Sequence, residues 1–204
     1  MLSGAELLAQ ALSEQGFFIM DNFLPSDYCK ELRAYAQKIY AQGAFHSSRI
    51  GLQQTLQNKQ EIRSDRIFWL DKEQTTNEAV DYFLKKIHHI QNDLNRLLFL
   101  SLHEYEVHFA YYSPGSYYKR HIDQFAQKKT RKISLVYYLN PCWQPEFGGT
   151  LDLYINSSAI TVNPIENRLI CFNSELPHEV QVTHQERYSI TGWLKTRSAE
   201  VLEI

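Results

Sequence analysis

The feature that most constrains the fold is a change in sequence period near Tyr105. Before it, apolar residues recur at helical spacing, most regularly from Val80 to Leu98. After it, apolar and polar residues alternate in short runs, which turn residues such as those at Asn140 and Asn163 separate. Helices followed by many short strands predict an α+β protein, in which the strands roll into a double-sheet barrel with helices packed on one side.

The expected elements follow from this period and from capping and turn residues. Helices are expected at residues 5–15, from Pro25-Ser26-Asp27 with Ser26 as the N-cap, and from Thr76-Asn77-Glu78. Strands are expected at residues 17–20, 66–70, 105–112, 118–121, 132–139, 150–155, 169–172, 179–182 and 187–194.

A polar segment interrupts the N-terminal half. Residues 44–63 are rich in Gln and show no clear period, so we expect a mobile lid within about 44–70. The sequence has no internal repeat, low-complexity tract or linker. We therefore expect one domain over residues 1–204, with helical support in 1–100 and a barrel core in 101–204.

Composition narrows the class of protein. The formal net charge of -2 argues against a nucleic-acid partner. Cys29, Cys142 and Cys171 form no closely spaced pair, which is typical of packing residues in a reducing compartment. The N-terminus shows neither a signal peptide nor a membrane span, so we expect a cytoplasmic protein, and we expect a monomer.

His121 and Asp123 are the first candidate site residues. Side chains two residues apart in a strand point to one face, so the imidazole and the carboxylate would converge. A His-x-Asp tripeptide alone is also compatible with a strand-end histidine beside a solvated aspartate. With His178 from another element, however, two histidines and one carboxylate leave three positions open on an octahedral metal, as in non-haem Fe(II) oxygenases.

Arg187 strengthens this interpretation. It shares one face of an expected strand with Ser189 and Thr191. A guanidinium beside an open metal can clamp the far carboxylate of a dicarboxylate that chelates the metal through its other end, and 2-oxoglutarate has that shape. The alternative for Arg187 is a surface ion pair with Glu186.

Six motifs spread over the chain match those of one family. They are Ile62-Arg-Ser-Asp-Arg-Ile-Phe-Trp69, Tyr118-Lys-Arg-His-Ile-Asp123, Val136-Tyr-Tyr-Leu-Asn140, Gly148-Gly149, Pro177-His-Glu-Val180 and Arg187-Tyr-Ser-Ile-Thr-Gly-Trp193. With them, the sequence resembles the 2-oxoglutarate/Fe(II)-dependent dioxygenases of the prolyl 4-hydroxylase family, closest to the oxygen-sensing (HIF-type) prolyl hydroxylases and their compact bacterial relatives.

The resemblance implies a double-stranded β-helix, which is a jelly-roll or cupin-like barrel, with N-terminal helices on one sheet. It implies Fe(II), the co-substrates 2-oxoglutarate and O₂, and ascorbate as reductant. The metal ligands and catalytic residues would be His121, Asp123 and His178. The resemblance also places Tyr138 and Thr191 with Arg187 at the 2-oxoglutarate carboxylate, and Tyr112 beside the iron.

Further residues are expected around this centre. Leu151 would belong to the apolar wall of the co-substrate pocket, and Gly148-Gly149 before it would allow a bend or a close backbone approach. His108 shares the strand face of Tyr112 by its period of two, so it is a candidate to line the pocket; the alternative is a hydrogen-bonded core residue. By resemblance, Arg63, Asp65 and Trp69 belong to a substrate-covering loop; the alternative for the Arg63–Asp65 pair is a surface ion pair.

The expected reaction is hydroxylation coupled to oxidative decarboxylation of 2-oxoglutarate to succinate and CO₂. By resemblance the substrate is a prolyl residue of a protein, hydroxylated at C4, and elongation factor Tu is the suggested partner. One alternative is a hydroxylase of free proline, another amino acid or a small metabolite, which the long lid disfavours. A second alternative is a non-catalytic barrel that binds metal or ligand, which the intact motif residues disfavour.

Overall fold

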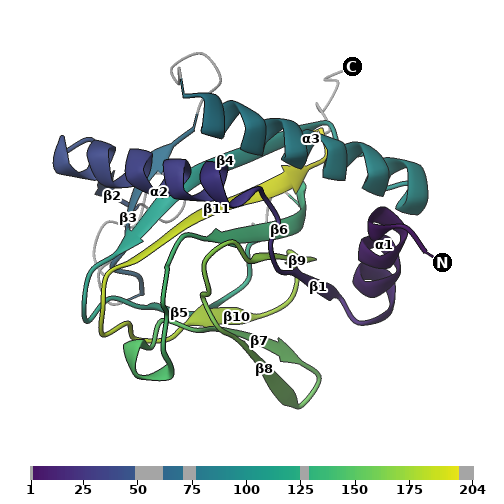
Figure 1. Cartoon of the computed structure of the whole chain (residues 1–204). Helices are drawn as coiled ribbons and strands as arrows, with labels where there is room; N and C mark the ends of the chain where they lie inside the picture. Colours follow the sequence, from purple (N-terminus) through teal and green to yellow (C-terminus); the bar gives the residue numbers. More distant parts are fainter. Residues whose placement is uncertain (1, 49–61, 71–76, 125–128, 198–204) are drawn as a thin grey trace, which may run out of the picture.

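The computed structural model describes residues 2–48, 62–70, 77–124 and 129–197 (Figure 1). These residues form three α-helices and eleven strands, with one short 3₁₀ turn at Pro145–Phe147. The helices are α1 (Gly4–Glu14), α2 (Ser26–Ala41) and α3 (Glu78–Leu98). The strands are β1 (Phe17–Met20), β2 (His46–Ser47), β3 (Arg66–Trp69), β4 (Glu104–Tyr112), β5 (Tyr118–His121), β6 (Arg131–Tyr138), β7 (Leu151–Ile155), β8 (Ser158–Val162), β9 (Leu169–Asn173), β10 (His178–Val180) and β11 (Arg187–Lys195).

The strands form two antiparallel sheets. The larger has the order β1-β9-β6-β11-β4-β3-β2, and the smaller has the order β5-β10-β7-β8. Figure 1 shows the helices on the outer side of the larger sheet and the smaller sheet on its other side. This arrangement confirms the expected α+β double-stranded β-helix with N-terminal helices on one sheet.

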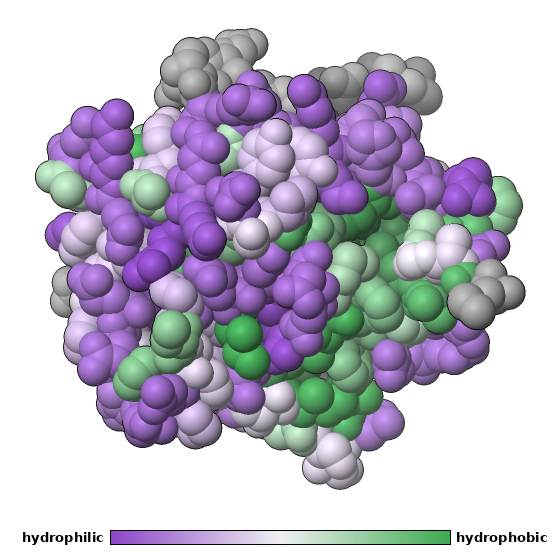
Figure 2. Space-filling view, viewed as in Figure 1, coloured by the Kyte–Doolittle hydropathy of each residue, from purple (hydrophilic) through white to green (hydrophobic). Residues whose placement is uncertain are grey.

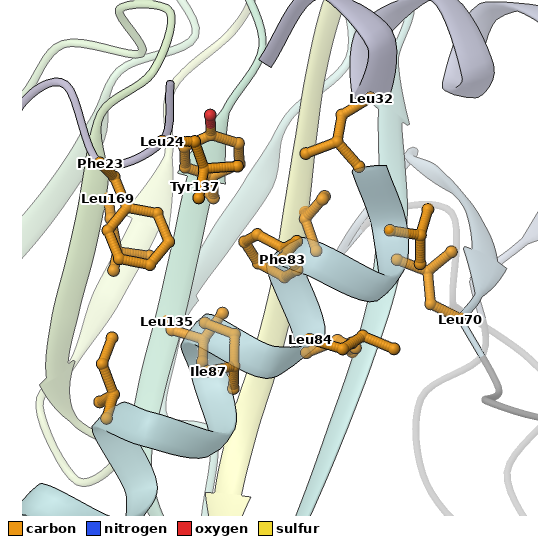
Figure 3. Close-up of a cluster of buried hydrophobic side chains, with 14 of the residues drawn as sticks. Phe23, Leu24, Leu32, Leu70, Phe83, Leu84, Ile87, Leu135, Tyr137 and Leu169 are labelled. Atoms are coloured by element: carbon orange, nitrogen blue, oxygen red, sulfur yellow. The ribbon is translucent and has the colours of Figure 1, made fainter. Parts of the chain in front are cut away.

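Amphipathic helices explain the layer on the larger sheet. In α3, the Asn77 side chain caps the first turn by accepting from the Val80 N–H at 3.1 Å. Its apolar stripe then packs inward: Phe83, Leu84 and Ile87 belong to one buried cluster with Leu135 from the sheet, and Figure 3 shows Ile87 beside Leu135. In Figure 2 the surface over α2 and α3 is mostly hydrophilic, because an amphipathic helix turns its polar face to solvent.

A second hydrophobic core lies between the two sheets. Inward-facing side chains of both sheets meet there, in keeping with the alternation along each strand. Tyr138 belongs to this inner core, whereas its neighbour Tyr137 belongs to the core under the helices. Alternation along β6 explains the opposite directions of these two tyrosines.

Most expected elements are confirmed, with boundaries shifted by a few residues. Two strands were missed: β2 has only two residues, and β8 follows a tight turn at Asn156, whose φ is 55°, with only Val162 of its five residues fully buried. The expected Ser26 cap is wrong, because Pro25 holds the cap position and makes no side-chain bond. The strand expected at 179–182 ends at Val180.

The expectation that all three cysteines pack inside is also corrected. Cys29 and Cys171 are buried free thiols, but Cys142 is exposed. None of the helices in the described ranges is long and apolar enough to cross a membrane.

Asn167 ties the sheet to the segment before α2. Its backbone has a φ of 62°, and its side-chain Oδ1 accepts from the Leu24 N–H at 2.9 Å and from the Tyr137 hydroxyl at 2.8 Å. Its Nδ2 donates to the Leu24 carbonyl at 2.7 Å. One buried side chain therefore satisfies three buried polar groups.

We expect Asn167→Gly to lower the free energy of unfolding by about 3 kcal/mol, because several buried groups lose their partners while glycine keeps the positive φ. Tyr137→Phe, which removes one of these bonds, should cost about 1 kcal/mol. Urea unfolding measures both. Equal costs for the two variants would contradict a role for the Asn167 side chain as a shared hub.

Candidate active site

His121, Asp123 and His178 form a compact cluster inside the barrel. His121 is the last residue of β5 and His178 the first of β10, and the two are register partners in the smaller sheet. Their Nε2 atoms lie 3.6 Å from Asp123 Oδ1 and 3.5 Å from Asp123 Oδ2, respectively. One ligand atom from each residue lies within 4.8 Å of the others, as a shared metal ion requires.

Asp123 does not reach this cluster by strand alternation, which corrects the expectation from the sequence. The strand ends at His121, and Asp123 lies in the bend that follows. Its backbone N–H donates to the Ser174 carbonyl at 3.1 Å, and its carbonyl accepts from Arg131 Nη1 at 3.3 Å. Contacts from later parts of the chain therefore set its position.

Both imidazoles are oriented for metal binding. The Nδ1 of His121 lies 2.7 Å from the Lys119 carbonyl, and the Nδ1 of His178 lies 2.9 Å from the Leu176 carbonyl. Because a carbonyl only accepts, each Nδ1 carries the proton and each Nε2 keeps its lone pair toward the cluster. This is the hydrogen-bonding pattern that orients histidine ligands in metal sites, so the residues present fit a metal.

The charge states agree with this fit. Burial opposes the ionisation of Asp123, but the imidazoles of His178 and His121 and the Ser134 hydroxyl hold the pKa of its carboxyl well below its usual range. Burial, partly offset by the Asp123 charge, lowers the pKa of His178, so this imidazole is neutral at neutral pH. An anionic carboxylate beside a neutral imidazole is the state that ligates a divalent cation.

Arg187 is buried beside the cluster, so the alternative of a surface ion pair with Glu186 is wrong. Only 3% of its surface is exposed, and Glu186 instead accepts from the Tyr111 hydroxyl at 2.9 Å. Arg187 Nε donates to the Gly149 carbonyl at 2.9 Å and Nη1 to Ser189 Oγ at 3.3 Å. Within the described part of the chain no carboxylate pairs with this guanidinium. A buried, uncompensated cation fits an anionic ligand.

The surroundings of Arg187 strengthen the fit to a carboxylate. Its guanidinium carbon lies 4.7 Å from the ring centre of Tyr112 and 5.2 Å from that of Tyr138. Among the described residues, the buried Tyr138 hydroxyl has no hydrogen-bond partner, so a donor is free close to the cation. A Cβ at Gly149 would lie 2.9 Å from Arg187 Cδ, which confirms that this glycine allows a close backbone approach.

One cavity joins these groups. It is lined by the three clustered residues together with Arg187, Thr191, Tyr112, Leu151, His108, Arg63 and Asp65, all of which were singled out from the sequence. Two other expected residues are not part of the lining but contact it: the Tyr138 ring lies beside the Arg187 guanidinium, and the Trp69 ring packs against His108 with centroids 4.8 Å apart.

Arg63 and Asp65 form a buried pair at this cavity, so the alternative of a surface ion pair is wrong. Arg63 donates from Nε and Nη2 to the two carboxylate oxygens of Asp65, at 2.7 Å and 2.5 Å. The Arg63 guanidinium also lies 4.3 Å from the centre of the Tyr118 ring. The expected mobile lid falls largely on residues 49–61, which lie outside the described residues.

His108 faces the same cavity as a neutral group. Burial, with a smaller contribution from the Arg63 charge, lowers the pKa of His108 to about 3. Its ring lies between Trp69 and Trp193, with centroids 4.8 Å and 5.5 Å away. Its Nδ1 is buried without a partner among the residues described, so it can bond to a molecule that enters the cavity.

Two contributors were missed from the sequence. The Tyr118 ring stacks on His121 with centroids 3.5 Å apart, and the Ser134 hydroxyl donates to Asp123 Oδ2 at 2.6 Å. Tyr118 was part of a quoted motif, and its place at the start of the strand that carries His121 was an available signal. Ser134 gave no such signal, because its contact joins residues far apart in the chain.

Comparisons with known proteins agree with this geometry. Residues 107–195 match the model of the 2OG-Fe(II) oxygenase superfamily. A Pseudomonas putida prolyl-4-hydroxylase structure is 34% identical, with a TM-score of 0.85, and the match covers 94% of this chain and 98% of that one. A Trichoplax adhaerens prolyl hydroxylase, solved with a hypoxia-inducible factor peptide, is 29% identical, with a TM-score of 0.86, over 94% of this chain and 88% of that one.

The similar proteins of known family are longer than the matched region by different amounts. The hypoxia-inducible factor prolyl hydroxylase of Caenorhabditis elegans is 29% identical over 95% of this chain, which spans 28% of that protein's length. The mouse prolyl hydroxylase EGLN3 is 27% identical over 92% of this chain and 82% of its own length. The shared fold, the clustered His and Asp side chains and the full-length similarity to the P. putida enzyme establish that the chain belongs to the 2OG-Fe(II) oxygenase superfamily, as an oxygenase of the prolyl hydroxylase type.

Proposed function

We propose that this protein hydroxylates a prolyl residue of a protein substrate, with His121, Asp123 and His178 as the metal ligands. The observation that carries the proposal is one cavity in which these three side chains face a buried guanidinium with no carboxylate partner among the described residues. When bound, Fe(II) and 2-oxoglutarate supply the oxidation: O₂ converts 2-oxoglutarate to succinate and CO₂ and adds a hydroxyl group to the substrate. Ascorbate is the proposed reductant.

The co-substrate end of the cavity is assigned to Arg187. Its planar guanidinium would hold the distal carboxylate of 2-oxoglutarate, and the free Tyr138 hydroxyl would donate to the same group. Thr191 lines the cavity and supplies a further hydroxyl, while Tyr112 and Leu151 shape its wall. Buried apolar surface around these groups excludes water, which strengthens each charge-assisted contact.

Another part of the cavity lining is assigned to the substrate. Arg63 and Asp65 form one wall there, and His108, with Trp69 behind it, offers an unpaired nitrogen to a carbonyl or hydroxyl. The Trichoplax relative holds a peptide of hypoxia-inducible factor, which supports a peptide rather than a free amino acid. Elongation factor Tu, suggested by the resemblance to compact bacterial enzymes, is the first protein to test.

Two measurements test the proposed reaction. Succinate formation with Fe(II), ascorbate and 2-oxoglutarate should rise when a prolyl peptide of the substrate protein is added. Mass spectrometry should then find one added oxygen on that prolyl residue. Stimulation by free proline and not by any protein would instead favour the small-molecule alternative, and no succinate under any condition would favour a non-catalytic barrel.

We expect Asp123→Asn to abolish turnover and to weaken Fe(II) binding, because a neutral amide replaces the one anionic ligand of the proposed centre. Asp152→Asn on β7 is the matched control, since the Asp152 carboxylate accepts from the Gln181 side chain at 2.7 Å and lies outside the lining of the cavity. Metal titration and succinate formation measure the effect. Near-normal iron affinity and turnover in Asp123→Asn would rule out this ligand set.

We expect Arg187→Lys to weaken 2-oxoglutarate binding about ten- to a hundredfold, because a lost charge-assisted contact costs on the order of 1.5–3 kcal/mol. An ammonium cannot make the planar two-point contact. The matched control is Arg168→Lys, at the Arg168–Asp21 pair outside the cavity. A 2-oxoglutarate titration checks the result, and an unchanged affinity would remove Arg187 from this role.

We expect Arg63→Ala and Asp65→Ala to impair hydroxylation of the protein substrate while leaving 2-oxoglutarate affinity nearly intact. Each leaves one buried charge without its partner, which costs about 3–5 kcal/mol and disturbs the substrate wall of the cavity. Asp93→Ala is the control, since it breaks the exposed Arg96–Asp93 pair. Thermal unfolding identifies any unfolded variant. Normal turnover of the protein substrate by folded variants would make the pair purely structural.

A further inference from the structure

The carboxylate of Asp123 is held by a chain of two serine hydroxyls. Ser134 Oγ, on β6, donates to Asp123 Oδ2 at 2.6 Å. Ser174 Oγ, in the turn after β9, lies 2.9 Å from Ser134 Oγ. Both serines are buried, with 1% and 0% of their surfaces exposed. Neither hydroxyl is a metal ligand in the proposed centre, yet both act on the one residue of that centre that no strand positions.

The donor directions in this chain follow from counting protons. A serine hydroxyl has one proton, and Ser134 gives its proton to the ionised carboxylate. The bond between the serines must therefore run from Ser174 to Ser134. Such a chain polarises each hydroxyl toward the carboxylate and strengthens the bond to Oδ2.

The same bond restricts how the carboxylate can turn. Asp123 Oδ2 accepts from Ser134 and lies 3.5 Å from His178 Nε2, while Oδ1 lies 3.6 Å from His121 Nε2. Rotation about the last side-chain bond would break the Ser134 contact. The Ser134 hydroxyl thus fixes the plane of the carboxylate relative to the two imidazoles, and no hydroxyl of the described residues donates to Oδ1.

The backbone of the same region is tied to Ser174 as well. Asp123 N–H donates to the Ser174 carbonyl at 3.1 Å, and Ser174 N–H donates to the Lys132 carbonyl at 3.0 Å. One turn therefore supports both the main chain and, through Ser134, the side chain of Asp123. This double support compensates for the end of the strand at His121.

We propose that Ser134, supported by Ser174, is a positioning residue that presents the Asp123 carboxylate to the metal and so sets the metal affinity. The inference rests on the proposed function of this centre. A purely structural role would differ in its effect: loss of the hydroxyl would lower stability but leave metal affinity unchanged. Hydrogen-bonding partners of metal ligands commonly contribute about ten- to a hundredfold to metal affinity.

The test compares four variants with the wild-type protein. Ser134→Ala removes the hydroxyl on the carboxylate, Ser174→Ala removes only its support, and Ser134→Thr keeps a hydroxyl at the same position. Ser116→Ala is the matched control, since Ser116 is a buried serine whose Oγ lies 3.0 Å from Ser113 Oγ, outside the lining of the cavity. Mn(II) is the probe, with its dissociation constant measured by electron paramagnetic resonance on the metal-free protein, and thermal unfolding is recorded without metal.

We expect Ser134→Ala to bind Mn(II) about tenfold more weakly, Ser174→Ala to show a smaller loss, and both Ser134→Thr and Ser116→Ala to match the wild type. Wild-type affinity in Ser134→Ala would overturn the inference, and so would equal losses in Ser134→Ala and Ser134→Thr. Should Ser134→Ala fail to fold, a wild-type affinity in Ser174→Ala would overturn it and a loss would support it. Failure of the wild-type protein to bind Mn(II) would instead refute the proposed metal centre.

Discussion

The pairing of β10 with its two neighbours is the constraint on which the site depends. In this small sheet His178 lies opposite His121 on β5 and opposite Leu153 on β7. The pairing fixes two imidazoles from distant parts of the chain side by side, with ring centroids 4.2 Å apart. The larger sheet, stiffened by α3 across its outer face, supplies the opposite wall of the cavity. Without this two-sheet closure, none of the polar groups inside the barrel would share one space.

The buried polar groups of this cavity are of two kinds: some have protein partners, and others are free to bind a ligand. The Asp123 carboxylate and the Arg63–Asp65 pair are satisfied by protein partners. Among the residues that the structure describes, the Arg187 guanidinium donates to Gly149 and Ser189 but has no carboxylate partner, and the Tyr138 hydroxyl has no hydrogen-bond partner. Since an unpaired buried cation is unfavourable, the protein gains most from a ligand that brings a carboxylate to this end of the cavity.

Features that depend on residues close together in the chain could be predicted from the sequence, and features that depend on distant contacts could not. The strand of Arg187 was predicted, and so was a strand directly after His178, because alternation and turn residues are local signals; the observed strand begins one residue earlier, at His178. The way Asp123 reaches the cluster was not, because Asp123 lies beyond its strand and takes its position from Ser134 and Ser174, which follow it in the chain. The strand β8 pairs with β7 and could have been predicted, because its Ile160, Thr161 and Val162 are β-branched residues that favour strands.

The central claim is that one cavity combines a metal centre with a cation that selects a dicarboxylate. The most direct measurement is a calorimetric titration of the Mn(II)-loaded and the metal-free protein with 2-oxoglutarate and with 2-oxobutyrate, which lacks the distal carboxylate. The account predicts that 2-oxoglutarate binds the Mn(II)-loaded protein at least about tenfold more tightly than 2-oxobutyrate does, and that removal of the metal weakens both. Equal affinities for the two acids, or affinities independent of the metal, would contradict it.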